Sequence, residues 1–553
     1  MTLRSLPLVL LFLLSGLTGC APAGRGAAPP RSPESDESWI SFFEEAEIGR
    51  LILDLSARER PGRVAFAGVT VLDVVSGELS PGRTVLVSEG RIEAVAPEGE
   101  ARVPRGYTRI EGRGRTLIPG LVDMHVHSTV TDADALLQLA NGVTSVRDMC
   151  GFPWALRVRE RIAAGRLLMP NRTVAGHILN AEPLGIHATV VTTPEEARRA
   201  VREQKAAGYD FIKVHNILPK EVYRAILDEA ARLGIRVVGH VPRGVTTAEA
   251  IEGGQLTLEH FKGSLPYGAL TRESAVWSCP TLYTYRMAQK GEEATRLIET
   301  AGEMRYVPAW KRRHWLEDAQ TEPGEERFFN LSTKIRDPLQ IRARLLAGTD
   351  SGGGYSNMVP GFALHEELEL LEQNGLSPLD VLRAATINAA RALEQEDELG
   401  TLAPGKRADL VLLAADPLAS LANLRHPAGV MVRGLWLDRQ ALDEILDRLE
   451  EIYRRSAADK TLANPSAAQT GRLIGRMENL TRDGWVFKDH QLEELAGLLR
   501  GRRLEEDARR VLALRGTGAG SSSEKPGPTP GSPRGPSGPE SPAAVPRRPG
   551  PPA

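Results

Sequence analysis

Apolar positions in the middle of the chain form short continuous runs that alternate with amphipathic stretches. Continuous apolar runs are typical of strands buried on both faces, and amphipathic stretches with helical spacing predict helices between them. Because strands that alternate with helices usually pair in parallel, the pattern predicts an α/β fold with a (β/α)8 TIM-like barrel over residues 118–395. The predicted strands are 121–127, 144–149, 173–177, 211–215, 237–240, 256–260, 276–282 and 345–350.

Two of the helices between these strands have clear start and stop signals. Residues 194–207 follow Thr193, whose hydroxyl suits an N-cap. Residues 220–233 end at Gly234, which suits the left-handed conformation of a C-cap. Both sets of bounds are therefore predicted from local chemistry alone.

Short strands separated by turn residues lie on both sides of the predicted barrel. They occupy residues 63–117 and return at residues 396–437. A closed barrel brings its two ends together, so the two segments can pair. We predict one small β-sandwich domain built from segments before and after the barrel.

The outer segments differ from this centre in composition. Residues 38–62 predict a helical lead-in, and residues 438–515 are helical and charge-alternating, with no chemistry that we can assign. Residues 516–553 are rich in Gly, Ser and Pro and poor in apolar residues, so we predict that they are disordered. The net charge is −2 and no basic run stands out, which argues against nucleic acid as a partner.

The first residues predict export. Residues 1–20 have the order of a signal peptide, with an apolar run at 6–14 that is too short to span a membrane. The letters LTGC at 17–20 resemble the bacterial lipobox, in which the cysteine is lipidated. This resemblance implies a protein anchored by lipid to the cell envelope, in the outer membrane and facing the periplasm, with residues 21–37 as a flexible linker. A secreted protein without the lipid is the alternative, and no other membrane contact is predicted.

Cys150 and Cys279 are the remaining thiols of the exported body. In an oxidising compartment they could form a disulfide, but the sequence does not place them within bridging distance. We interpret both as small buried hydrophobic residues.

Residues that bind metals are concentrated at the C-terminal ends of the predicted strands, where barrel enzymes carry their functional groups. His125 and His127 share one face of the first strand, because successive side chains alternate between faces. Two histidines on one face can bind one metal ion, although this short pattern also occurs by accident. The other strand ends carry His177, His215, His240, His260 and Asp350.

Lys213 lies on the same face of the fourth predicted strand as His215, inside the predicted barrel. A buried ammonium group is costly, so this lysine either pairs with a carboxylate, loses its proton or is chemically changed. Carboxylation by CO₂ would turn it into an anion with two oxygens that can bridge two cations.

Taken together, these motifs resemble the amidohydrolase superfamily. The motifs are HVH at 125–127, FIKVH at 211–215, VVGH at 237–240, LTLEH at 256–260 and AGTDSG at 347–352. Similar flanking segments lie at 117–123, 385–390 and 400–412. A lysine on strand four looks like the binuclear-metal branch with a carboxylated lysine, which contains Xaa-Pro dipeptidases and imidazolonepropionase-like enzymes.

The resemblance implies a set of cofactors and roles. Two divalent metal ions, Zn²⁺ by preference, would share a bridging hydroxide and the CO₂-derived carbamate on Lys213. Asp350 would take the proton of the hydroxide and deliver it to the leaving amine. The implied metal ligands are His125, His127, Lys213, His240, His260 and Asp350.

The implied activity is hydrolysis of the C–N bond of a small-molecule amide, cyclic amide or short peptide, with a dipeptidase among the options. A cyclic-imide or imidazolone hydrolase fits the same centre. The alternative class is a metal-binding exported lipoprotein with a non-catalytic amidohydrolase-like barrel. Lys213 and Asp350 argue against that class, because metal storage needs neither a lysine inside the barrel nor a carboxylate placed to move protons. Candidates for substrate binding, each of which could equally be structural, are His177, His187, His215 and Tyr283.

Two further features stand apart from this pattern. Residues 285–340, between the last two predicted strands, exceed the compact family pattern and are interpreted as a lid or an oligomer contact. An oligomer contact would make the protein a homo-oligomer. His365 lies on a predicted helix with an apolar stripe and is interpreted as structural.

Overall fold

The computed structural model describes residues 36–58, 62–100, 103–127, 132–260, 276–287, 291–320, 344–352 and 357–515. The predicted signal peptide, nearly all of the predicted linker, the C-terminal tail and part of the 285–340 stretch lie outside the described residues. Among the helices that are described, none combines the length and the apolar character needed to cross a membrane.

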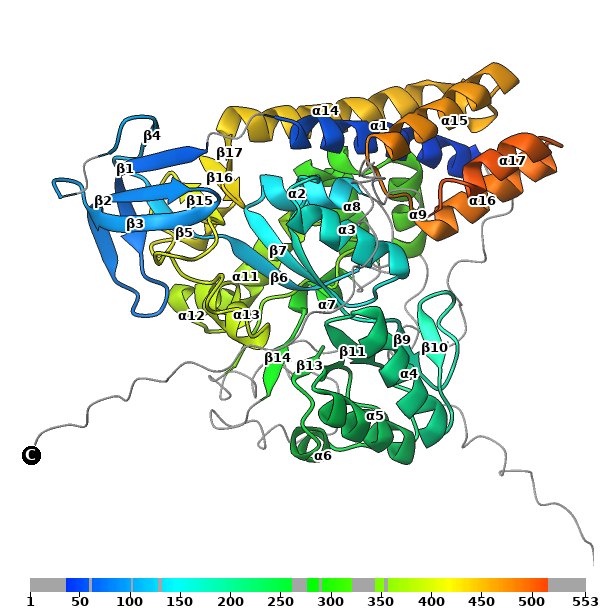
Figure 1. Cartoon of the computed structure of the whole chain (residues 1–553), viewed down its shortest axis with the longest axis horizontal. Helices are drawn as coiled ribbons and strands as arrows, with labels where there is room; N and C mark the ends of the chain where they lie inside the picture. Colours follow the sequence, from blue (N-terminus) through cyan, green and yellow to red (C-terminus); the bar gives the residue numbers. More distant parts are fainter. Residues whose placement is uncertain are drawn as a thin grey trace, which may run out of the picture. The chain divides into compact units, whose positions relative to one another are not determined.

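The predicted barrel strands form two parallel sheets (Figure 1). The first sheet contains, in this order, β6 (Leu121–Val126), β7 (Val143–Asp148) and β8 (Asn171–Val174). The second has the order β10-β9-β11-β12-β13-β14, with bounds Ala188–Val190, Ile178–Asn180, Phe211–Val214, Arg236–Gly239, Thr257–Glu259 and Trp277–Cys279. Every strand pairing in these sheets is parallel, which confirms the α/β class.

Isolated parallel bridges connect the two sheets to each other and to residues 344–352. The bridged pairs are Ala175 with Phe211, Ser278 with Leu345, and Val126 with Ser351. Backbone hydrogen bonds support them: the Leu346 amide donates to the Ser278 carbonyl at 2.9 Å, and the His127 amide donates to the Ser351 carbonyl at 2.8 Å. Residues 344–352 therefore run between β14 and β6.

Three predicted strands differ from the structure by more than one residue at an end, and β9 and β10 were not predicted. The strand predicted at 173–177 is β8, at Asn171–Val174. Residues 345–350 are not a regular strand, and the strand predicted at 276–282 ends at Cys279 because Leu282 already begins helix α7 (Leu282–Met287). Residues 345–350 keep backbone hydrogen bonds to β14 and β6 but form only isolated bridges with them. For the strand predicted at 276–282, the physical reason is backbone conformation, because Thr281 has a positive φ angle of 51°. A residue in that conformation turns the chain out of a ladder, and this is rare outside glycine.

Helices cover the parallel strands as predicted. Helix α4 (Pro194–Ala207) begins with a capping box in which the Thr193 hydroxyl accepts from the Glu196 amide, and α5 (Lys220–Leu233) ends at Gly234 with φ 61°. Both sets of predicted bounds are confirmed. The other helices around these strands are α2 (Ala133–Ala140), α3 (Pro153–Ala163), α6 (Thr247–Glu252), α11 (Phe362–Gln373), α12 (Pro378–Ala384) and α13 (Ile387–Ala392).

Strands from both sides of the parallel sheets join in one mainly antiparallel sheet, of order β17-β16-β15-β5-β1-β2-β3, with β4 paired to β1. The early strands β1 to β5 are Arg63–Leu72, Leu79–Ser88, Arg91–Pro97, Thr108–Glu111 and Thr116–Pro119, and the late strands β15 to β17 are Leu410–Leu413, Gly429–Val432 and Leu435–Asp438.

This antiparallel sheet is coiled on itself. Phe66 of β1 and Trp436 of β17 are four positions apart in the sheet order, a separation of about 19 Å in a flat sheet, yet their ring centroids are 5.1 Å apart. The described residues thus form one coiled sheet where we expected the two sheets of a sandwich. The physical reason is that β5 pairs with both β1 and β15 and so joins the early and late strands by hydrogen bonds.

Helices from both ends of the described chain pack together. Helix α1 (Asp36–Ser56) contacts α14 (Arg439–Ala458), α15 (Ala467–Arg482) and α16 (Asp489–Gly501), and α17 (Glu505–Leu512) packs on α15 and α16. At Gly49 a Cβ atom would lie 3.0 Å from the Trp485 ring, so a larger residue there would require the ring to shift. Part of the 285–340 stretch joins this group, because Trp310 of α9 (Ala309–Ala319) donates to Glu44 at 3.1 Å.

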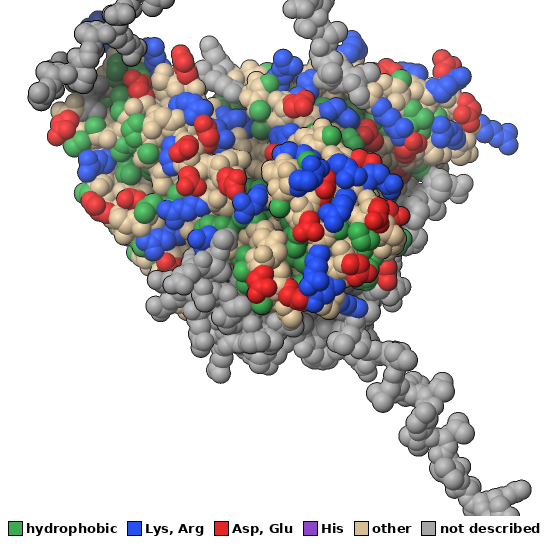
Figure 2. Space-filling model, turned by 60° about the horizontal axis from the view of Figure 1, so that its bottom comes forward, with side chains coloured by type: hydrophobic (Ala, Val, Ile, Leu, Met, Phe, Trp, Pro, Cys, Tyr) green, Lys and Arg blue, Asp and Glu red, His purple; other side chains and the backbone are tan. Residues whose placement is uncertain are grey.

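On the face shown in Figure 2, basic and acidic side chains are interspersed, without a large area of one sign.

Candidate metal centre

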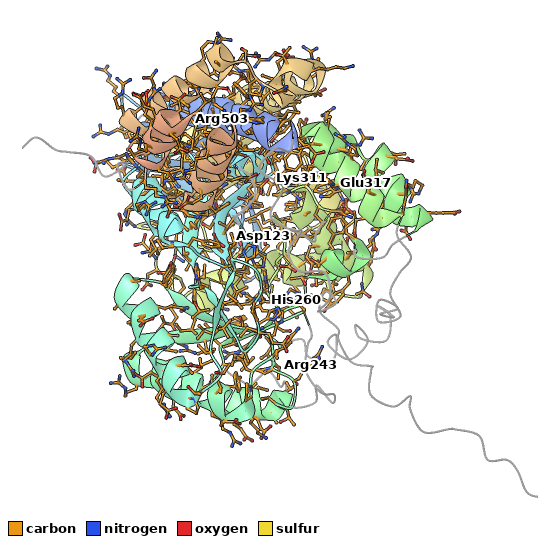
Figure 3. All side chains as sticks on the ribbon, turned by 90° about the vertical axis from the view of Figure 1, so that its right-hand side faces the viewer. Asp123, Arg243, His260, Lys311, Glu317 and Arg503 are labelled. Atoms are coloured by element: carbon orange, nitrogen blue, oxygen red, sulfur yellow. The ribbon has the colours of Figure 1, made fainter. Side chains whose placement is uncertain are left out.

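The ligand candidates come together at the C-terminal ends of the parallel strands. His125 lies on β6, and His127 follows that strand directly. Lys213 lies on β11, His240 follows β12, and His260 follows β13 (Figure 3 labels His260 and, on β6, Asp123). Asp350 precedes the bridge between Ser351 and Val126.

The Asp350 carboxylate lies among the imidazoles. Its Oδ1 is 3.0 Å from His127 Nε2 and 3.3 Å from His125 Nε2, and its Oδ2 is 4.0 Å from His260 Nε2. Ligand atoms of His125, His260 and Asp350 all lie within 4.8 Å of one another. Nitrogen and carboxylate oxygen at this spacing form a donor set that suits Zn²⁺.

Each of the three buried imidazoles is held through its Nδ1 atom. His125 Nδ1 is 2.8 Å from Glu259 Oε2, His240 Nδ1 is 2.7 Å from Asn216 Oδ1, and His260 Nδ1 is 2.6 Å from Thr281 Oγ1. The carboxylate oxygen of Glu259 and the amide oxygen of Asn216 can only accept, so they place the proton of His125 and of His240 on Nδ1 and the lone pair on Nε2, the arrangement of a metal-binding histidine. The Thr281 hydroxyl orients His260 in the same way and allows the same tautomer. Burial lowers the pKa of each ring, that of His260 to about 4, so all three are neutral at pH 7.

Lys213 enters the same centre from β11. Its side chain is 1% exposed, and its Nζ is 3.5 Å from His125 Nε2. No carboxylate forms an ion pair with Lys213 among the described residues, and burial lowers the pKa of its amine. Gly239 makes room for it, because a Cβ there would lie 3.0 Å from Lys213 Cδ and 2.2 Å from the Val214 carbonyl oxygen.

Behind His125 lies a fully buried charge pair that the sequence motifs did not reveal. Arg147 donates to Glu259 Oε1 at 2.8 Å, to Thr257 Oγ1 at 3.1 Å and to the Met124 carbonyl at 2.6 Å. Burial opposes ionisation of Glu259, but the charge of Arg147 and the contact with His125 lower its pKa below the ordinary value. Glu259 therefore remains an anion that orients His125. In the sequence, the position of Glu259 directly before His260 in LTLEH was the signal that could have indicated this role.

A second group holds the backbone that carries Asp350. Asp123 Oδ1 accepts from the Thr349 amide at 3.0 Å, and its Oδ2 accepts from the Thr349 hydroxyl at 2.7 Å. The two ligand candidates Asp350 and His260 both have φ 60°, a conformation that costs free energy outside glycine. Such strained residues cluster at functional sites, and here neighbouring hydrogen bonds hold the strained segment in place.

Comparison of the sequence with family models shows which family the chain belongs to. The model of the amidohydrolase family matches residues 116–437 of the chain. The chain belongs to the amidohydrolase family.

Similar proteins agree with this assignment. Ochratoxinase of Aspergillus niger is 25% identical over 461 residues, covering 68% of this chain and 88% of that protein. The solved structure of bottromycin amidohydrolase has 28% identity and a TM-score of 0.61, covering 73% of this chain and 93% of that one. A Bifidobacterium longum structure, proposed to be a prolidase, has 28% identity and a TM-score of 0.57, covering 71% of this chain and all of that one. The chain is therefore an amidohydrolase, a hydrolase that acts on C–N bonds of small molecules.

The predicted substrate residues of this amidohydrolase fall into two groups. The His215 ring centroid is 4.3 Å from that of His240, so His215 adjoins the ligand candidates. His177 and His187 instead surround Phe152, at centroid distances of 4.7 and 5.8 Å. All three histidines are partly exposed, and burial lowers the pKa of His215 to about 3 and that of His187 to about 4.

Tyr283 is buried under the centre. It is 6% exposed, and its amide donates to Glu367 Oε2 at 2.7 Å. This contact fixes the start of α7 next to Thr281, the residue that holds His260. The backbone of Tyr283 thus helps to position Thr281, and a role of its side chain in substrate binding stays a prediction. His365, on the same helix as Glu367, is 2% exposed, in agreement with a structural role.

Both thiols of the amidohydrolase body are free and buried. Burial raises the pKa of Cys150 and of Cys279 above the ordinary value, so neither is a thiolate at pH 7. The interpretation of both as small hydrophobic residues is confirmed.

Glu367 leads to a prediction about pH. Burial raises its pKa from 4.5 to about 8, so between these values the folded chain binds a proton that the unfolded chain has released. The contribution of Glu367 to the free energy of unfolding is therefore fully present below pH 4.5. It is lost as pH rises toward 8, at up to about 1.4 kcal/mol per pH unit. We expect Glu367→Gln, which keeps an acceptor oxygen, to become more stable relative to wild type as pH rises.

Urea unfolding of both proteins at several pH values between about 5 and 8 checks this expectation. Glu372→Gln, at a partly exposed position of the same helix, serves as the matched control. Parallel stability curves for wild type and Glu367→Gln would show that Glu367 is ionised in the folded protein.

Proposed function

We propose that this amidohydrolase is a metal-dependent hydrolase of amides, cyclic amides or short peptides, with two divalent cations, Zn²⁺ by preference, held by His125, His127, Lys213, His240, His260 and Asp350. Members of the family typically bind metals. The observation that carries the proposal is the common orientation of His125, His240 and His260: in each ring the Nδ1 atom contacts an oxygen of a neighbouring residue, so the Nε2 atom is the one turned away from that contact.

The residues of the centre fit such cations. The donor set is nitrogen and carboxylate oxygen, and a carbamate on Lys213 would add two anionic oxygens at a place where the described residues supply no paired carboxylate. When bound, the cations lower the pKa of water and polarise the scissile carbonyl. Asp350 takes the proton of the attacking water and delivers it to the leaving amine. The Asp350 carboxylate lies at the centre for this role, with Oδ1 3.3 Å from His125 Nε2 and 3.0 Å from His127 Nε2.

The proposal includes the architecture around the centre. We propose that the two parallel sheets and residues 344–352 form a closed (β/α)8 barrel, because the three isolated bridges connect them in a cyclic order. We also propose that the chain is exported and lipid-anchored, which rests on the LTGC sequence at 17–20.

Metal content and turnover test the proposal on one variant. We expect Lys213→Ala to lose most of its bound Zn²⁺ and its hydrolysis of N-acyl amino acids and dipeptides, because the bridging group is gone. Metal is measured by mass spectrometry per chain, and turnover by released amine with and without added Zn²⁺. Lys205→Ala, which removes an exposed lysine of α4, is the matched control.

Recovery of activity in Lys213→Ala on addition of short carboxylic acids would support the carbamate. Full metal content and full turnover in Lys213→Ala would exclude it. Wild-type protein without metal and without turnover would refute the metal-dependent mechanism as a whole.

A further inference from the structure

The C-terminal helices, which lie outside the family match that ends at residue 437, contact segments that follow the first two parallel strands. Lys488, directly before α16, is 1% exposed, and its Nζ lies 3.3 Å from Asp132 Oδ1 and 5.6 Å from the centroid of the Trp154 ring. Asp132 is the N-cap of α2 and Trp154 lies on α3, so both follow the ends of the first two parallel strands. A buried ammonium needs such a partner, and the ion pair therefore attaches α16 to this end of the strands.

The attachment brings His490 into a cluster of rings. Phe152 lies at its centre, with ring centroids 4.7 Å from His177, 5.8 Å from His187, 6.1 Å from His490 and 6.2 Å from Trp154. These separations fall in the range of about 4.5 to 7 Å that aromatic pairs prefer. His177, His187 and His490 are all partly exposed, so solutes can reach the cluster.

The cluster adjoins the proposed metal ligands. His177 follows β8 and Phe152 follows β7, at the same strand ends as His127. His187 Nδ1 lies 3.8 Å from Cys150 Sγ, just after β7, and the Met149 amide of the same segment donates to the Val126 carbonyl, next to His127, at 2.9 Å. A substrate group bound against these rings would therefore lie beside the strand end that carries His127.

The charge and hydrogen-bonding state of the rings indicate which kind of group the cluster can bind. Within the described residues, His177 Nε2 and His490 Nδ1 are buried atoms without a hydrogen-bond partner. Burial lowers the pKa of His177, and it lowers that of His187 and of His490 to about 4, so the rings are neutral at pH 7. Lys488 already pairs with Asp132. A charged substituent would lose its hydration here without gaining an ion pair, whereas a flat uncharged ring gains ring contacts.

We propose that Phe152, His177, His187 and His490 form a subsite for an uncharged aromatic group of the substrate, and that His490 is a specificity-determining residue supplied by the C-terminal helices. The inference deepens the proposed function, on which it rests. It gives residues 438–515, which had no assigned chemistry, a role in substrate recognition.

Ketone analogues that cannot be hydrolysed test the subsite without relying on turnover. 4-Oxo-4-phenylbutanoate replaces the amide nitrogen of N-benzoylglycine with carbon, and 2-benzyl-4-oxopentanoate does the same for N-acetylphenylalanine. 4-Oxopentanoate is the matched compound without a ring. Binding of all three to the full metal-loaded chain is measured by calorimetry for wild type, His490→Ala, His490→Phe and the control His314→Ala, which removes a half-exposed histidine of α9.

We expect at least one aromatic analogue to bind wild type several-fold more tightly than 4-oxopentanoate, and His490→Ala to reduce that ratio by about 2- to 12-fold. His490→Phe keeps a ring and should retain the preference, as should His314→Ala. Equal binding of all three compounds to wild type, or an unchanged ratio in His490→Ala, would overturn the subsite. The binding measurement does not depend on turnover. A failure of the proposed function in the Lys213→Ala experiment can therefore be distinguished from a failure of the subsite.

Discussion

Replacing Asp350 with Asn is expected to lower kcat by about 10²- to 10⁴-fold, the usual contribution of a general acid–base residue. The Asn amide has nearly the shape of the carboxylate and can still meet His127 Nε2 and His125 Nε2, which lie 3.0 and 3.3 Å from Asp350 Oδ1. It cannot take a proton from water or return one to the leaving amine. The loss should therefore appear in kcat even when the variant carries metal.

Initial rates at saturating substrate, together with metal content per chain, check this result. Asp228→Asn, at an exposed position on α5, is the matched control and should behave as wild type. Metal-loaded Asp350→Asn with a kcat within about threefold of wild type would assign the proton transfer to another group.

Replacing Arg147 with Met is expected to destabilise the folded protein by about 3–5 kcal/mol, the cost of breaking a buried pair and leaving one charge alone. Arg147 and Glu259 are both 0% exposed and 2.8 Å apart. Without the guanidinium, Glu259 must keep its charge in an apolar interior or take up a proton and release His125. The same change should therefore weaken metal binding through His125.

Urea unfolding of Arg147→Met, Glu259→Gln and the double variant measures this effect. Because the two residues contact each other, the double variant should lose less stability than the sum of the single variants. Arg236→Met removes an exposed pair with Glu394 at 3.1 Å and should cost no more than about 1 kcal/mol. Strictly additive losses for Arg147 and Glu259 would mean that the pair does not stabilise the core as one unit.

Local signals in the sequence determined much of the fold. The bounds of α4 and α5 follow from a capping hydroxyl at Thr193 and a left-handed Gly234, both of which act within one turn of helix. Strand alternation placed His125 and His127 on one face, and the order of apolar runs indicated parallel strands whose ends carry Lys213, His240 and His260. These features depend on neighbours in sequence, so the sequence alone suffices for them.

Tertiary structure decided the features that depend on residues far apart in the chain. The oxygens that hold the imidazoles come from other strand ends: Glu259 holds His125 from 134 positions away. The coiled single sheet depends on β5 joining early and late strands, and the irregular path of residues 344–352 depends on hydrogen bonds to Asp123 and His125. Such contacts are set by packing, which leaves no local periodicity in the sequence. His490 shows this most clearly, because only the folded chain brings the C-terminal helices to Phe152.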